Sequence, residues 1–213
     1  MKKIVVLAAI LFSVQLQAQI KEGFAKFAMD IEGENSGMAS AIMANSTLTL
    51  YFKNEKSLAE IVSQMYSMKT FTDSKGTLVL MDAMGQKTFY RSTLADKEKK
   101  NNKEAEPVIL YTKETKKILG YDCSKALVTN KDASGKGSQV ITVWYTDKIQ
   151  TNTGLGLISP EILAKFKGMV LEAEMARGPV KTKITAKQIS VKPVADAVFA
   201  VSTNGYTEIK KGK

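Results

Sequence analysis

The stretch Met169–Thr185 reads MVLEAEMARGPVKTKIT, and its pattern of side chains decides the expected fold. Apolar side chains occupy every second position up to Met175, and Glu172 and Glu174 lie between them. The alternation returns over Val180–Thr185, where lysine and threonine fill the intervening positions. A period of two places successive side chains on opposite faces of a β-strand. The stretch therefore predicts two strands, each with one apolar face and one wet face.

The same pattern recurs along most of the chain, between short polar turns. It predicts further strands at 27–31, 47–52, 77–81, 87–91, 107–111, 118–128 and 139–145. Residues 57–66 fit a helix and a strand equally well, because their apolar side chains also have helical spacing. The segments 96–106 and 130–138 are polar and are expected to be solvated loops. Strands at such regular spacing, joined by turns and not by crossover helices, predict one antiparallel sheet.

Two segments carry helical signals. Ser159-Pro160-Glu161 supplies an N-cap, a proline at the first helical position and an acid in the first turn, and Gly168 ends this segment. A second short helix is expected over 194–199, directly after a proline. The predicted fold class is therefore mainly β, with one or two short helices.

Residues 1–18 have the pattern of a secretory signal peptide. Two lysines precede nine uninterrupted apolar residues, Ile4–Phe12, a run too short to span a bilayer. Ala18 is a small residue before a plausible cleavage site, so we expect the mature chain to begin near Gln19, with no cysteine there for lipid attachment. The sequence predicts a periplasmic or secreted protein without a transmembrane segment, in which residues 19–213 form a single domain.

The composition excludes several kinds of chemistry. The 213 residues contain no histidine and one cysteine. Histidine-based nucleophiles, multi-cysteine metal clusters and internal disulfides are therefore excluded. We predict no metal and no cofactor. The net charge of +10 is spread over strand faces and a C-terminal lysine cluster, without an arginine-rich patch. Nucleic acid is therefore not an expected partner.

The remaining candidates for chemistry have simpler structural explanations, so no catalytic residue is predicted. Cys123 has no second thiol and no histidine to lower its pKa, and we expect it to be buried and inert. The M-x-x-M pairs at 65–68 and 81–84 suit a soft metal, but flexible methionines more often fill a core or line a cavity. Glu172 and Glu174 can in principle act as paired carboxylates, but a solvated outer face explains them more simply.

Two stretches resemble a known family. TKETKKILGYDCSKALV (Thr112–Val128) and ITVWYTDKI (Ile141–Ile149) resemble the exported bacterial family called domain of unknown function 4412 and, more distantly, the GLPGLI family. Segments 166–171 and 198–206 are similar to the first family, whereas GLGLISPE (Gly154–Glu161) departs from the naming motif of the second. The resemblance assigns no activity and no binding residues. It implies an architecture like the lipoprotein-carrier folds of the periplasm, in which a strongly curved sheet wraps short helices around an apolar cavity.

The leading hypothesis is an exported, non-catalytic half-barrel made of a single strongly curved antiparallel sheet. Its concave apolar face would bind a hydrophobic ligand, such as a lipid or the acyl chain of a lipoprotein. A long one-sided sheet has few helices to cover it, and unfilled apolar space accepts lipid-like guests. The side chains expected to line this cavity are Leu50, Phe52, Met169, Leu171 and Met175.

Two other classes of function stay open at this point. In the first, the sheet closes on a core filled by its own side chains, and the protein is an envelope structural or interaction protein with no small ligand. In the second, it is a carboxylate enzyme acting on polysaccharide. The second is disfavoured because only 8% of the residues are aromatic and Trp144 is the sole tryptophan available for sugar stacking.

Overall fold

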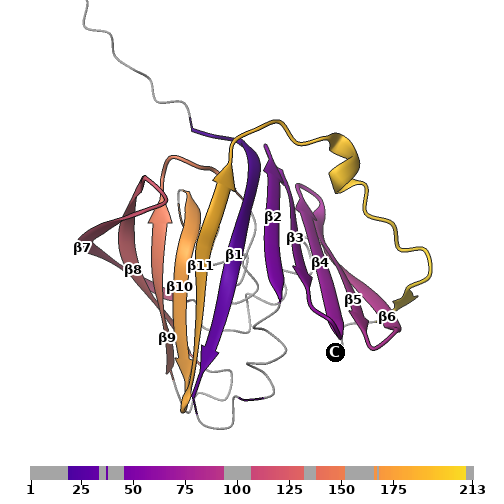
Figure 1. Ribbon diagram of the computed structural model, residues 1–213, viewed down its shortest axis with the longest axis horizontal. Helices are drawn as coiled ribbons and strands as arrows, with labels where there is room; N and C mark the ends of the chain where they lie inside the picture. Colours follow the sequence, from indigo (N-terminus) through magenta and orange to yellow (C-terminus); the bar gives the residue numbers. More distant parts are fainter. Residues whose placement is uncertain are drawn as a thin grey trace, which may run out of the picture.

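The computed structural model describes residues 19–33, 37, 46–93, 107–131, 138–151, 166 and 168–209. Within these residues the chain forms twelve β-strands and one 3-10 helix, η1 (Figure 1). Their bounds are β1 (Glu22–Glu32), β2 (Thr47–Lys53), β3 (Lys56–Val62), β4 (Tyr66–Asp73), β5 (Gly76–Ala83), β6 (Gln86–Thr93), β7 (Val108–Ile118), β8 (Tyr121–Lys131), β9 (Ser138–Thr146), β10 (Met169–Arg177), β11 (Val180–Ser190), η1 (Asp196–Phe199) and β12 (Thr207–Glu208).

All of these strands belong to one sheet, in the order β12-β6-β5-β4-β3-β2-β1-β11-β10-β9-β8-β7. Every neighbouring pair is antiparallel except β12 and β6, which pair in parallel over two residues. The sheet is open, because β12 and β7 stand at its two ends, and it curls on itself (Figure 1). The prediction of a mainly β protein built on a single curved antiparallel sheet is therefore confirmed.

Three irregularities in the strand pairing help to curve the sheet. The register shifts between Lys26 and Phe27 on β1, between Tyr111 and Thr115 on β7, and between Val170 and Glu172 on β10. A β-bulge of this kind bends its strand and increases the local twist. The three shifts lie in the half of the sheet formed by β1 and β7 to β11, so the curvature of this half arises partly within the strands themselves.

Alternation along the strands gives the sheet two different faces. We call the face that carries Phe27, Leu50, Phe52, Val143 and Ile184 the inner face, and these side chains belong to the main hydrophobic core. The opposite surface is the outer face. Along β2, for example, one side chain in two belongs to the main core, as the period of two predicts.

Residues 194–208 form a strap that crosses the outer face of β3 to β6, and we call it the C-terminal strap (Figure 1). Val194 and Phe199 pack with Leu58 of β3 in one small apolar cluster. Val201 contacts a second cluster on β5 and β6. The strap thus covers the side of the sheet that is opposite to the main core.

The strap explains why one segment has an ambiguous pattern. Residues 57–66 fit both a helix and a strand, and the structure shows strand β3, which ends at Val62. Leu58 packs under the strap on the outer face, whereas Ile61 belongs to the main core on the inner face. Because both faces of β3 are covered, the strand lacks the alternation that identifies the others. The short helix expected at 194–199 is confirmed as η1, which begins two residues later.

Two other sequence predictions need correction. The strand expected over 118–128 is wrong at its start, because Leu119 and Gly120 form a turn in which both residues have positive φ angles. β7 instead continues to Ile118, and β8 begins after the turn. The sequence does not predict β4. Polar residues occur on both sides of this strand, so Tyr66, Met68 and Thr70 do not stand out as one apolar face.

Several predictions fall outside the described residues. They are the signal peptide at 1–18, the polar segment 96–106, the centre of the loop 130–138, and the helix expected to start at Ser159. The extent of the domain, 19–213, stays a prediction. In the described part of the chain, no helix has the length and apolar character needed to cross a membrane.

Candidate functional site

The structure places the five predicted cavity residues in or against one hydrophobic core. Leu50 and Phe52 lie on β2, whereas Met169, Leu171 and Met175 lie on β10, and only β1 and β11 stand between these strands. The first four are at most 1% exposed and belong to the main core, and Met175 is partly buried against it. Residues more than a hundred positions apart thus belong to one core. Their role in binding a ligand stays a prediction.

Methionines on the inner face are less deeply buried than this core. Met29 on β1, Met68 on β4 and Met175 on β10 are partly buried side chains that pack against it. Met68 stands directly opposite Met81 of β5, which is also partly buried. We call Met29, Met68, Met81 and Met175 the inner-face methionines. A thioether side chain is flexible and polarisable, so such positions adapt to apolar surfaces of different shapes.

The inner face of β3 to β6 also carries a line of hydroxyl groups. Ser57 stands opposite Thr72, Thr72 opposite Thr77, and Thr77 opposite Ser92. We call these four residues the hydroxyl row. Sequence reasoning missed this row, because it depends on the register between four strands, one of which was not expected.

A tyrosine on the same face is held in its neutral form. The pKa of Tyr66 is raised by burial, and the nearby Tyr90 adds to this effect. The phenol of Tyr66 is therefore a neutral donor and acceptor of hydrogen bonds at physiological pH. It adds to the uncharged polar character of this part of the inner face.

Charged side chains of β1 to β6 all alternate onto the outer face. The inner-face positions of these strands are Gly23, Ala25, Phe27, Met29, Ile31, Leu48, Leu50, Phe52, Ser57, Ala59, Ile61, Tyr66, Met68, Thr70, Thr72, Thr77, Val79, Met81, Ala83, Gln86, Thr88, Tyr90 and Ser92. This surface is apolar on β1 and β2 and becomes richer in hydroxyl groups toward β6. It therefore suits an uncharged ligand with both apolar and polar parts.

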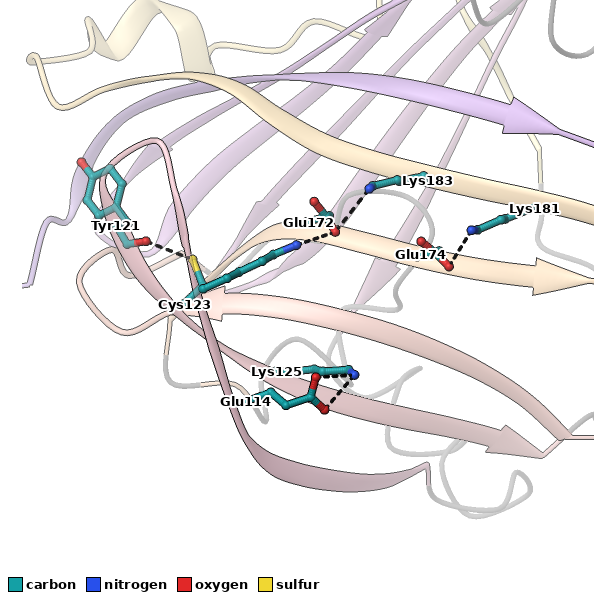
Figure 2. A network of polar contacts seen from close by, with 9 residues as sticks. Glu114, Tyr121, Cys123, Lys125, Glu172, Glu174, Lys181 and Lys183 are labelled. Atoms are coloured by element: carbon teal, nitrogen blue, oxygen red, sulfur yellow. Dashed lines mark hydrogen bonds and ion pairs between the residues drawn. The ribbon is translucent and has the colours of Figure 1, made fainter.

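The carboxylates considered for catalysis lie on the outer face, in a network of ion pairs (Figure 2). Glu172 Oε1 accepts a hydrogen bond of 2.8 Å from Lys116 Nζ and lies 3.6 Å from Lys183 Nζ. Glu174 Oε1 pairs with Lys181 Nζ at 3.0 Å. Glu172 is only 9% exposed, so the expectation of a solvated position is wrong for this residue. Lysine side chains pair with both carboxylates, so the two glutamates are part of a structural network of ion pairs.

A groove of about 490 Å³ lies between the C-terminal strap and the outer face of β2 to β5. Its walls include Tyr51, Tyr206 and the ion pair of Glu60 with Lys69, in which Oε1 and Nζ are 2.8 Å apart. None of the five predicted cavity residues lines it. This groove and the inner face are therefore separate surfaces.

Cys123 is buried, as the sequence predicts. It is 1% exposed in the main core, and its Sγ donates a hydrogen bond of 3.5 Å to the carbonyl oxygen of Tyr121 (Figure 2). Burial is the main reason that its pKa rises to about 11. The thiol is therefore protonated at physiological pH, and its inertness stays a prediction.

An open, curled antiparallel sheet defines this protein as a β half-barrel. Residues 39–208 match the sequence model of the family described as N-glycanase peptide, N-terminal domain. The chain belongs to this family.

Solved structures with the same fold include PNGF-II in two crystal forms. The P21 form has a TM-score of 0.54 at 17% identity, and the match covers 89% of this chain and 31% of that chain. The C2 form has a TM-score of 0.51 at 18% identity over the same shares. This chain therefore spans about a third of the length of PNGF-II, and the likeness concerns the fold alone.

The similarity to other solved structures is weaker. The lipoprotein LppX of Mycobacterium tuberculosis has a TM-score of 0.36 at 9% identity, over 84% of this chain and 90% of that chain, which is too weak to support an argument about function. No curated protein matches the sequence significantly. The resemblance to domain of unknown function 4412 and to the GLPGLI family is not shown by these matches and stays a prediction.

Proposed function

We propose that this protein is an exported, non-catalytic binding protein that holds an apolar ligand against the inner face of its curled sheet. One observation carries the proposal: the inner face of β1 to β6 is uncharged, and its methionines are only partly buried. In the described residues, the C-terminal strap covers the opposite face instead.

The burial pattern indicates where the ligand would lie. Leu50, Phe52, Met169 and Leu171 are already buried against other side chains and gain little from a guest. The inner-face methionines still have surface to bury, and removing apolar surface from water contributes roughly 25 cal/mol per Å². We therefore place the ligand against Met68 and Met81, beside the filled core rather than within it.

The absence of catalysis is also part of the proposal. Cys123 has a pKa raised to about 11, which makes it a poor nucleophile. Glu172 and Glu174 are held by lysines on the outer face and do not face the inner surface. Within the described residues no group of three or more acids and cysteines could hold a metal ion.

Titration with an apolar fluorescent probe tests this proposal. Met81→Lys places a charge on the inner face and is expected to weaken probe binding by about tenfold or more, since a buried charge without a partner is costly. Met84→Lys is the matched control, because Met84 is 77% exposed in the following turn. A folded wild-type protein that binds no probe would contradict the proposal and favour a fully filled core.

The family match favours a second candidate function. As this second candidate, we propose that the chain is a module that contacts glycoproteins for an enzyme of the N-glycanase kind, because its sequence matches the N-terminal domain of that family. Binding to a glycoprotein, compared with the same protein after its glycans are removed, tests this candidate. Glycan-dependent binding together with failure of the apolar probe would support the module and reject the carrier.

A further inference from the structure

The hydroxyl row crosses the inner face from a closed region to a more open one. Ser57 is 0% exposed and Thr72 is 7% exposed, whereas Thr77 and Ser92 are partly buried. The Oγ1 atoms of Thr72 and Thr77 lie 3.4 Å apart, so these two hydroxyls contact each other. The row is therefore a polar strip that begins inside the protein and reaches β6, next to the end of the sheet.

Ser57 gives this strip an unmet hydrogen-bonding requirement. Its Oγ is buried and has no hydrogen-bond partner among the described residues. Buried polar side chains nearly always have a partner, because an unpaired one keeps the cost of losing its water. Ser57 stands between Phe52 and Thr72 on the inner face. A polar group of a ligand at this position would supply the missing partner.

The surroundings of the hydroxyl row are unfavourable for a charged group of a ligand. Lys53, Lys56 and Lys69 all alternate onto the outer face, and Lys53 Nζ is already paired with Glu22 and Asp196 there. A carboxylate or phosphate at the row would lose its water without gaining a counter-ion. A neutral hydroxyl or ester group loses much less on the same transfer.

The apolar partner surface lies on the same strands. Met68 is four residues along β4 from Thr72, and Met81 is four residues along β5 from Thr77. At 3.3 Å per residue this separation is about 13 Å, which matches an acyl segment of roughly ten carbon atoms. One ligand can therefore contact the hydroxyl row with its polar end and the inner-face methionines with its chain.

We infer that the ligand is a neutral, hydroxyl-bearing lipid of the acylglycerol class, with its polar end at the hydroxyl row. This inference rests on the proposed function and names the class of ligand for the same face. The ester and hydroxyl oxygens of such a lipid accept and donate hydrogen bonds without carrying charge, as Ser57 and Thr72 require.

Competition between two lipids of equal chain length tests the inference. The probes are monooleoylglycerol and oleate at pH 8, each displacing the apolar fluorescent probe from the full-length protein. The neutral lipid is expected to bind about tenfold or more tightly than the anionic one. Ser57→Ala and Thr72→Val are expected to remove most of this preference, whereas Thr49→Val, on the outer face of β2, keeps it.

Thermal unfolding of the same variants separates binding from folding. Ser57→Ala removes an unpaired buried hydroxyl, so its midpoint is expected to stay the same or rise while the lipid preference falls. If oleate binds as tightly as monooleoylglycerol, the inference is overturned and the proposed function stands. If neither lipid nor the apolar probe binds, both are overturned.

Discussion

Lys116 on β7 places its Nζ 2.8 Å from Glu172 Oε1 on β10, although β8 and β9 separate the two strands in the sheet. The same ammonium lies 4.3 Å from the centroid of the Trp144 ring on β9. The lysine thus joins a carboxylate that is 9% exposed to the only tryptophan of the chain. This contact holds three strands together across the outer face.

Lys116→Met is therefore expected to destabilise the protein. The substitution keeps most of the stem of the side chain, and among the described residues it leaves Glu172 with the longer contact of 3.6 Å to Lys183. Loss of the charged hydrogen bond and of the cation–π contact costs about 1–2 kcal/mol. Chemical denaturation followed by Trp144 fluorescence measures this change. Lys117→Met is the control, because its pair with Asp122 is exposed and contributes less than about 0.5 kcal/mol. An equal loss of unfolding free energy in the two variants would contradict this prediction.

Cys123 is expected to react slowly with thiol reagents in the folded protein. Its pKa of about 11, against an ordinary value of 9.0, lowers the thiolate fraction at pH 8 about a hundredfold, and burial slows access further. The measurement compares labelling rates with and without denaturant. The same pKa lowers stability at high pH, because above pH 9 the unfolded state loses a proton that the folded state keeps. Rapid labelling of the native protein would disprove the prediction.

The start of the C-terminal strap is expected to loosen in acid. Lys53 Nζ lies 3.1 Å from Asp196 and donates a hydrogen bond of 3.0 Å to the carbonyl oxygen of Val194, whose own N–H donates to Glu22. The hydrogen bond from Lys53 holds the pKa of Asp196 below its ordinary value of 3.8. A lowered pKa means that this contribution is complete above pH 3.8 and is lost as the pH falls further.

Hydrogen exchange of the Val198 amide, which bonds to the carbonyl oxygen of Ala195, reports on this change. The protection of this amide, relative to its intrinsic exchange rate, is expected to fall as the pH drops below 3.8. Asp196→Asn removes the titrating group and should make this protection insensitive to the same part of the pH range. If that variant shows the same acid response as the wild type, another group is responsible.

Gly23 is expected to tolerate no side chain. Its φ angle is +154°, and a Cβ would overlap the carbonyl oxygen of Ser190 and approach the ring of Phe52. Gly23→Ala therefore forces apart the backbones of β1 and β11, at a cost of about 3 kcal/mol or more. Gly85 is the comparison, because its φ is +84° but a Cβ there meets nothing within 4 Å. Gly85→Ala is expected to cost about 1 kcal/mol. Denaturant midpoints of the two variants check this ranking.

The mature protein is expected to begin at or near Gln19. Ile20 pairs with Ile149 in a parallel bridge, and Gln19 Nε2 donates to the carbonyl oxygen of Asp147, so the first residues of the expected mature chain take part in the fold. Intact-mass measurement on protein purified from the cell envelope checks the prediction. Retention of Met1 in that material would refute it.

The predictability of each element depended on how many of its faces are buried. The segment Met169–Met175 was identified correctly as a strand, because apolar and polar side chains alternate without interruption. The segment 57–66 was ambiguous, since Leu58 is covered by a strap from residues more than 130 positions later. β4 was missed because its inner face is made of tyrosine, methionine and threonine, which do not stand out from its polar outer side.

The sequence by itself determined the period of two, the lack of histidine chemistry, the burial of Cys123 and the choice of a single antiparallel sheet. These features depend on local alternation and on composition, which are the same however the strands are aligned with one another. Only the tertiary structure decided that Ser57 stands opposite Thr72 and that Lys116 reaches Glu172. Both relationships depend on strand register and on the curl of the sheet, which are set by packing between segments far apart in the chain. The candidate ligand surface was also decided by the tertiary structure, because the hydroxyl row forms only when four strands are aligned.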